Sequence, residues 1–257
     1  MIEIRTIRKD EAEQFLALLC GVFDLDVGRA RKIFFTEPMF DLARKWALYE
    51  DGEMRTILTT TPLLFGLGPA FGVAGVATDR SHQRRGLAQR IIERVLEHGA
   101  EAGEPRCLLF AHDEKVYARA GLETVDSVMR ADVLAEFPVD APATLGFDEV
   151  RRIYESWAEK EPCRLRRDER RWKYWQWTLR TCEEAPGGYV CVEPMLCREA
   201  IVSNGLKAWP LMPGTRWLGL ESMTEAIGAP VEKARHELHV MTYGFDERPQ
   251  MFMTDQF

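Results

Sequence analysis

Residues 83–88, Gln-Arg-Arg-Gly-Leu-Ala, are of the types that hold an anion. They open a helix whose apolar positions recur at helical spacing from Leu87 onward. The first turn of a helix has backbone N–H groups without helical partners, and the helix dipole adds partial positive charge there. Gly86 lets a ligand approach the backbone, while Arg84 and Arg85 add fixed charge and further donors. The chemistry suits a pyrophosphate, although an ordinary basic helix start with glycine in a tight turn fits these residues equally well.

Two common phosphate-binding motifs do not match this sequence. It contains no GxxxxGK followed by Ser or Thr, which excludes a P-loop. Gly66, Gly68 and Gly72 miss the GxGxxG spacing and precede an expected strand instead of following one, which excludes the dinucleotide fingerprint. The helix start near residue 87 therefore stays the candidate anion site.

The elements expected in the first half would place this helix start just after a buried strand. Asp51-Gly52 between two apolar segments predicts a hairpin, because both central turn positions favour positive φ. The other expected elements, read from apolar periodicity, are a strand at 2–7, helices at 10–23 and 28–35, a strand at 71–77, the helix from 87, a strand at 107–111, a short helix at 112–120 and a strand at 125–133.

The second half follows a predicted linker, Pro138–Pro142. The elements expected beyond it are helices at 147–158 and 168–179, strands at 188–193 and 198–203, a helix at 220–227, and strands at 237–243 and 251–254. The order helix, helix, hairpin therefore occurs twice. We expect two domains, 1–137 and a shorter 144–257, and the second has no counterpart of the Gly86 segment.

Two motifs in the first half resemble those of one enzyme superfamily. The run from Val76 to Ala88 resembles the acetyl-CoA motif of the GNAT N-acetyltransferases, in which Arg/Gln-x-x-Gly-x-Gly/Ala follows a strand. Downstream, Tyr117 to Gly121 resembles the Tyr-x-x-x-Gly-Phe element, with Leu122 in place of the phenylalanine. A GNAT domain followed by a degenerate GNAT-like domain resembles the Eis-type acetyltransferases. The implied fold is α/β (α+β): a mixed, mostly antiparallel sheet flanked by helices, plus a smaller, incomplete GNAT-like C-terminal domain.

The resemblance also implies which residues hold acetyl-CoA. The strand end at Val76, Ala77 and Thr78 would pair with the pantetheine arm. His112 and Asp113 would border the thioester. The backbone N–H groups that would cradle the pyrophosphate belong to Arg84, Arg85, Gly86, Leu87, Ala88 and Gln89.

Acetyl transfer to an amine needs a proton for the leaving CoA thiolate. Tyr117, whose ordinary pKa is about 10, is the candidate general acid; the alternative is a half-buried tyrosine that braces a helix end. The resemblance implies acetyl transfer from acetyl-CoA to a primary amine of a small-molecule or peptide acceptor, by direct attack. The alternative is a non-catalytic acyl-CoA-binding or sensor protein.

The general base is less evident, because the expected strand at 71–78 has no carboxylate where many relatives carry a glutamate. One candidate is a base that acts through water, from Glu114, Asp79 or His112. The other comes from the Eis-type resemblance, which implies that the terminal carboxylate, here on Phe257, reaches the active site.

Composition and sequence motifs limit the kinds of partner that we expect this protein to bind. The net charge is −7, whereas nucleic-acid binders normally carry a basic excess, so no nucleic acid is expected. The start of the chain lacks the apolar run of a signal peptide, and no apolar stretch approaches the roughly 20 residues that span a bilayer. We expect a cytoplasmic protein without membrane contact, and a homodimer is compatible with this interpretation. No metal is expected, because His236 and His239 do not form HExxH and lie in a strand pattern.

Overall fold

The computed structural model describes residues 1–136, 142–178 and 180–257. Its strands are β1 (Ile2–Thr6), β2 (Lys45–Glu50), β3 (Glu53–Phe65), β4 (Gly68–Thr78), β5 (Cys107–Ala111), β6 (Glu123–Val133), β7 (Leu165–Arg166), β8 (Cys182–Ala185), β9 (Gly188–Val192), β10 (Leu196–Ile201), β11 (Arg216–Leu220) and β12 (Val231–Tyr243). Its α-helices are α1 (Ala12–Phe23), α2 (Val27–Phe34), α3 (Leu87–Glu101), α4 (Lys115–Ala118), α5 (Phe147–Ala158), α6 (Glu169–Trp177) and α7 (Glu221–Ala226). Short 3₁₀ helices are η1 (Lys9–Glu11), η2 (Leu42–Arg44), η3 (Arg80–His82) and η4 (Met253–Asp255).

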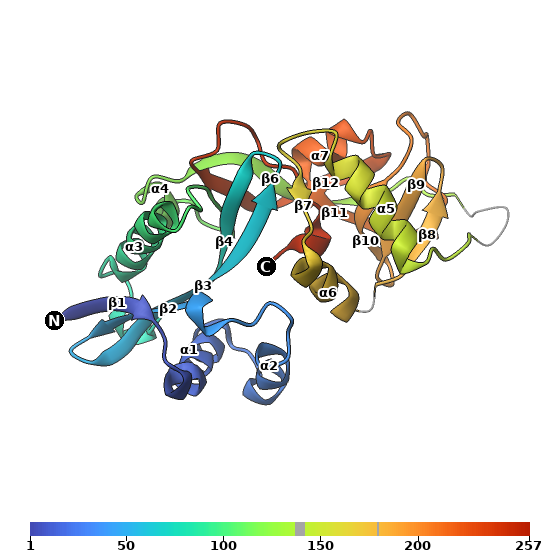
Figure 1. Cartoon of the computed structure of the whole chain (residues 1–257). Coiled ribbons are helices and arrows are strands. Elements are labelled where there is room, and N and C mark those ends of the chain that lie inside the picture. The colour runs from blue at the N-terminus through green and yellow to red at the C-terminus, as the bar shows by residue number, and fades with distance from the viewer. Residues whose placement is uncertain (137–141, 179) are drawn as a thin grey trace.

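The strands join in one mixed, mostly antiparallel sheet with the order β1-β2-β3-β4-β5-β12-β6-β11-β10-β9-β8, and β7 pairs with β3. The helices flank this sheet, as the fold expectation required. Figure 1 shows the two halves of the molecule on either side of the chain end, with α1 and α2 under the first half and α5 and α6 on the second. Among the described residues, no helix combines the length and the apolar character that a membrane crossing would require.

The first half is layered because β2 alternates its side chains between two cores. Trp46 and Leu48 pack in the cluster that α3 covers, whereas Ala47 and Tyr49 pack in the cluster that α1 and α2 cover. Since successive strand residues point to opposite faces, one buried strand supplies both layers. All six residues of β2 are buried or nearly so, lysine included.

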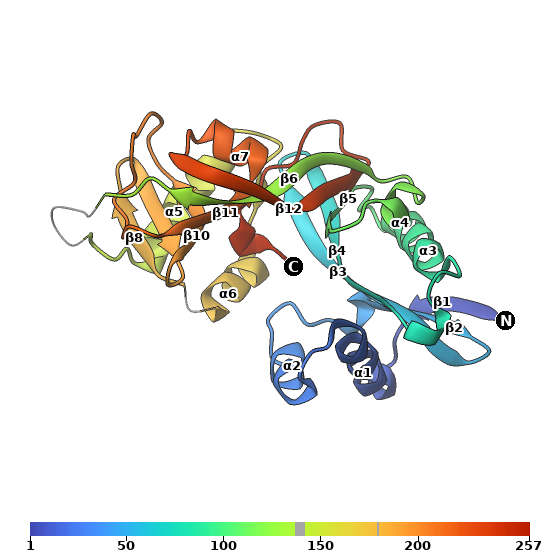
Figure 2. The ribbon, with the colours of Figure 1, turned by 180° about the vertical axis from the view of Figure 1, so that it is seen from behind.

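β12 connects the two halves. It comes from the end of the chain but lies between β5 and β6, antiparallel to both. Its register runs from Tyr243 opposite Cys107 on β5, and from Val231 opposite Val133 on β6. Figure 2 shows β6 and β12 running together from one half into the other.

Most expected elements are confirmed, with four differences in the second half. Residues 251–254 were expected to form a strand; the prediction is wrong, and η4 forms there instead. That segment reads Met-Phe-Met-Thr, and all four residues are buried. A short apolar run of this kind does not distinguish a strand from a helix, because it has no alternation of polar and apolar positions that would show the repeat. The strands β7, β8 and β11 were not expected. The predicted linker at 138–142 falls almost wholly outside the described residues, and the division into domains 1–137 and 144–257 stays a proposal.

Candidate functional site

The start of α3 has an unusual backbone. Arg84 and Gly86 both have left-handed conformations, with φ of 63° and 77°. Gly86 is the N-cap residue and has no side chain with which to cap, and the first helical bond runs from Arg90 N–H to the Gly86 carbonyl. The N–H groups of the first turn therefore have no intrahelical acceptor, which is the arrangement that binds anions. A left-handed arginine is a strained feature that marks functional loops.

The side chains of this loop divide into two roles. Arg85 forms a bidentate ion pair with Glu50 at the end of β2, at 2.7 and 2.8 Å. Arg84 is exposed. Gln83 Nε2 donates to the Thr78 carbonyl over 3.3 Å and so ties the loop to β4. The charge expected from two arginines is thus partly neutralised, and Arg84 supplies the exposed share.

The strand that leads to this loop parts from its neighbour. β4 is parallel to β5, and in the described chain their pairing runs from Phe71–Cys107 to Val73–Leu109. β4 continues to Thr78, so Val76, Ala77 and Thr78 lie past the last pair. A bulge sets this end: Gly75 and Val76 both lie opposite the single residue Leu58, and Gly75 has a φ of 60°.

The expected thioester end lies where β5 stops. His112 and Asp113 are exposed, and the Asp113 carboxylate accepts the Lys115 backbone N–H at 3.0 Å, which starts α4. Tyr117 lies on α4 and packs partly buried against the cluster under α3. Burial raises the pKa of the Tyr117 phenol above its ordinary 10. Gly121 then ends this turn with a φ of 90°.

Phe257 lies against the end of the β4–β5 pairing. A Cβ built on Gly72 would meet the Phe257 ring at 2.2 Å, so this ring occupies the space that the missing side chain leaves. The ring centroid is also 5.6 Å from that of Phe110 on β5. The chain end therefore contacts both strands near the point where they part.

A buried charge network holds the chain end in place. Arg167 lies between two carboxylates, with Nη2 at 2.7 Å from Glu199 and 2.8 Å from Asp255. The Thr254 hydroxyl also bonds to Glu199. Arg171, from α6, donates to the Asp255 carbonyl at 3.3 Å and to the Pro62 carbonyl of β3 at 2.9 Å. Buried charges are tolerated when they are paired in this way, and the pairing links the second half to β3.

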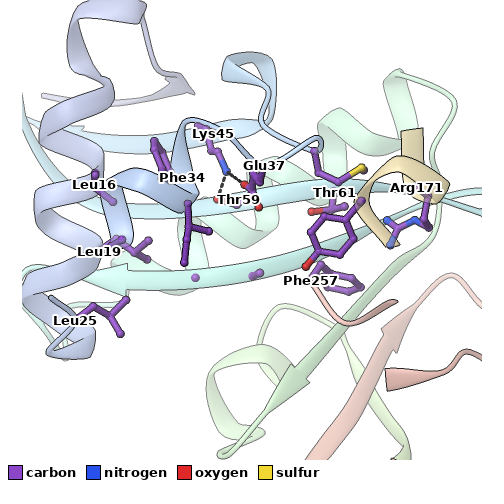
Figure 3. A pocket seen from close by; sticks show the side chains of 16 residues that line it. Leu16, Leu19, Leu25, Phe34, Glu37, Lys45, Thr59, Thr61, Arg171 and Phe257 are labelled. Atoms are coloured by element: carbon purple, nitrogen blue, oxygen red, sulfur yellow. Dashed lines mark hydrogen bonds and ion pairs between the residues drawn. The ribbon is translucent and has the colours of Figure 1, made fainter. Parts of the chain in front are cut away.

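A cavity of about 310 Å³ lies next to this chain end. It is bounded by α1, α2, β3, β4 and α6, and Ala74 and Gly75 bring the β4 bulge into its wall. Figure 3 shows aliphatic side chains at one end, Arg171 and Phe257 at the other, and Lys45, Glu37 and Thr59 between them.

The sequence analysis did not identify the charged residues of this cavity. Lys45 opens a strand whose next four residues are apolar, which was an available signal; nothing local marked Glu37. Arg171 lies in the expected helix at 168–179, and its side chain is 3% exposed.

The two C-terminal histidines do not come together at one site. His236 lies 3.3 Å from Glu221, whereas His239 lies 4.0 Å from Glu114. Within the described residues, no group of three or more His, Cys, Asp or Glu side chains is placed to hold a metal ion.

Comparisons with known proteins find relatives of the first half of this chain. Residues 3–125 match the family model for an acetyltransferase (GNAT) domain. The N-acetyltransferase Eis of Mycobacterium tuberculosis is 30% identical over 136 residues, which are 47% of this chain and 33% of that protein. The same figures hold for Eis of Mycobacterium bovis. The chain thus spans about a third of the length of the curated relatives it matches.

Solved structures share the fold across nearly the whole chain. A GCN5-related N-acetyltransferase from Kribbella flavida has a TM-score of 0.70 at 15% identity and covers 94% of this chain and 70% of its own. A putative acetyltransferase from Pyrococcus horikoshii has a TM-score of 0.68 at 12% identity, with 97% and 91% covered. Eis1 from Mycobacterium abscessus has a TM-score of 0.58 at 15% identity, with 93% and 73% covered. Residues 3–125 thus match a GNAT acetyltransferase domain, and the chain as a whole shares its fold with these solved structures.

Proposed function

We propose that this chain is an acetyl-CoA-dependent N-acetyltransferase that acts on a primary amine of a small molecule or peptide. The observation that carries the proposal is the start of α3, where left-handed Arg84 and Gly86 expose first-turn N–H groups beside the end of β4. Such a turn would bind the pyrophosphate of acetyl-CoA. The pantetheine arm would then follow the part of β4 that lies past its pairing with β5.

The cavity beside the β4 bulge would hold the acceptor. In the proposed reaction the amine nitrogen attacks the acetyl carbonyl carbon, and a backbone N–H near Val76 stabilises the oxyanion. The C–N bond forms and the C–S bond breaks as the thiolate leaves. Tyr117 gives its proton to the sulfur and is re-protonated from solvent. Its raised pKa keeps it protonated, which is the state a general acid needs.

The proton lost by the amine goes to a base, for which we propose the Phe257 carboxylate. Its ring contacts both Gly72 and Phe110, and Phe257 lines the cavity. The water-mediated candidates are less well placed: Asp79 accepts from Ser81 at 2.8 Å, and Glu114 accepts from Thr124 at 2.7 Å. His112 is exposed.

Tyr117→Phe tests the proposal. The variant should lose about a hundredfold or more in CoA-thiol release over an amine panel, with unchanged acetyl-CoA affinity, because it lacks only the transferable proton. In the wild type, the alkaline limb of the pH–rate profile should lie above pH 10.

Three results would count against this assignment. Full activity of Tyr117→Phe would exclude the tyrosine as the acid. Tight acetyl-CoA binding by the wild type without turnover on any amine would favour a binding or sensor protein. Unchanged activity and thermal stability after removal of Phe257 would exclude its carboxylate as the base.

A further inference from the structure

The cavity beside Phe257 has mostly apolar walls. Leucines 16, 19 and 25, Ile33, Phe34 and Met39 form its α1–α2 side. Its volume of about 310 Å³ is at the lower end of the range for small-molecule sites, roughly 300–1,000 Å³. Such a space suits one compact apolar group. A large, many-hydroxyl amine would have to desolvate its polar groups against hydrocarbon.

The mouth of the cavity is apolar as well. Leu25 and Ile33 line it, yet their exposed fractions are 48% and 53%. These side chains therefore form a wall that begins at solvent and continues inward to the buried Leu16 and Phe34. An apolar ligand would cover them as it enters.

Among the described residues that line the cavity, Glu37 supplies the one carboxylate side chain. Its nearest cation is Lys45, whose Nζ is 3.7 Å from Glu37 Oε1 and 3.4 Å from Thr59 Oγ1. Both distances are long for a charged hydrogen bond. Burial raises the pKa of Glu37, opposed by Lys45, and burial lowers the pKa of Lys45, opposed by Glu37. The carboxylate is thus loosely compensated by its cation in a mostly buried site, and its side chain is 23% exposed.

The other cation of the cavity, Arg171, is engaged elsewhere. Its guanidinium donates to two backbone carbonyls and lies 3.9 Å from the Asp255 carboxylate. Lys45 also lies over the Phe34 ring, 4.8 Å from its centroid. Neither cation is left to receive a carboxylate from a ligand.

We propose that the acceptor is an apolar monoamine, whose ammonium binds the Glu37 carboxylate while its hydrocarbon or aryl body lies against the α1–α2 wall. This proposal rests on the proposed function for its chemistry, but the binding that it describes does not depend on turnover. It excludes polycations, which would need several carboxylates, and amino acids, which would need a free cation.

Three probes separate these classes: 2-phenylethylamine, phenylalanine, which differs from it by a carboxylate, and spermidine, a polycation. We expect CoA-thiol release with 2-phenylethylamine at a kcat/KM at least tenfold above that with either of the others. Glu37→Gln should lower this kcat/KM by roughly tenfold or more, because a hydrogen bond to a charged group is lost. Glu13→Gln, on the same half but outside the cavity and 53% exposed, is the matched control and should match the wild type.

Direct binding separates this proposal from the proposed function. Calorimetry with 2-phenylethylamine and CoA-loaded protein should show binding that Glu37→Gln weakens and Glu13→Gln does not. If no amine is turned over but this binding holds, the acetyltransferase assignment fails and the present proposal stands. If phenylalanine or spermidine is the better substrate, or if Glu37→Gln equals the wild type in both assays, the present proposal is wrong while the acetyltransferase assignment stands.

Discussion

Arg84 and Arg85 are neighbours with different tasks. Arg85 is committed to Glu50, so it braces the loop against β2. Arg84 has the left-handed backbone and the exposed side chain, so it presents both a reoriented N–H and a charge. Strain of this kind persists only where the surrounding structure enforces it, and here the ion pair of Arg85 and the Gln83–Thr78 bond do so.

The two ends of α3 offer a matched pair of substitutions. Gly86 and Gly103 have φ of 77° and 80°, and a Cβ built on either would meet nothing within 4 Å among the described residues. Alanine at either position should therefore cost about 1–2 kcal/mol of stability through left-handed strain alone. Gly86→Ala should also weaken acetyl-CoA binding by about tenfold, because its Cβ would enter the proposed pyrophosphate site. Calorimetric titration checks this, and equal affinities for the two variants would contradict that site.

At the scale of elements, local sequence patterns predicted most of the first half. The residues 83–88 and the hairpin at Asp51-Gly52 carry their information in adjacent positions, and the helix and strand periods around them are clear. The cavity could not be predicted in this way. Glu37 and Arg171 are far apart in sequence, and no local pattern relates them to each other. Both line the cavity because α6 packs against β3.

The entry to α1 shows how charge fixes one element on another. The Glu11 carboxylate accepts from Arg5 of β1 at 2.8 Å through two nitrogens, and from the Arg8 backbone N–H at 2.7 Å. The hydrogen bond from Arg5 lowers the pKa of Glu11 from its ordinary 4.5 to about 2. The ionised form is thus favoured in the folded state, and the strand and the helix are joined through it.

This arrangement predicts a pH-dependent stability difference. Because the folded pKa is lowered, the contribution of Glu11 is complete above pH 4.5 and is lost as the pH falls toward 2. Glu11→Gln should therefore lower the free energy of unfolding by about 2 kcal/mol at pH 7, and the difference should vanish near pH 2. Urea unfolding at several pH values measures it. Glu13→Gln, at an exposed ion pair, should change little; an equal effect of both variants at pH 7 would contradict the role of Glu11.

The whole molecule depends on a strand that the sequence analysis could place only locally. The strand at 237–243 was expected, but its position between β5 and β6 was not, because partners some 100 residues away leave no trace in local periodicity. β12 buries Val240 and Met241 completely and pairs with both neighbours. The sheet of the first half is thus completed by β12, from the last part of the chain. The overall α/β class could be predicted from the sequence, but the insertion of β12 between β5 and β6 could not.

The position of β12 between β5 and β6 allows a test of the proposed domain 1–137. Expressed alone, these residues should fail to fold cooperatively, because β5 and β6 would face each other with unpaired edges and no β12 core residues. A short connection would suffice to add β12 to this half. The Leu134 N–H donates to the Pro230 carbonyl at 2.7 Å, so the end of β6 already lies beside the start of β12. Residues 1–134 joined through Asn-Gly to residues 230–246 would form a tight hairpin there. We expect this chimera to unfold in one thermal transition and to bind acetyl-CoA. Cooperative unfolding and acetyl-CoA binding by 1–137 alone would show instead that this half is independent of β12.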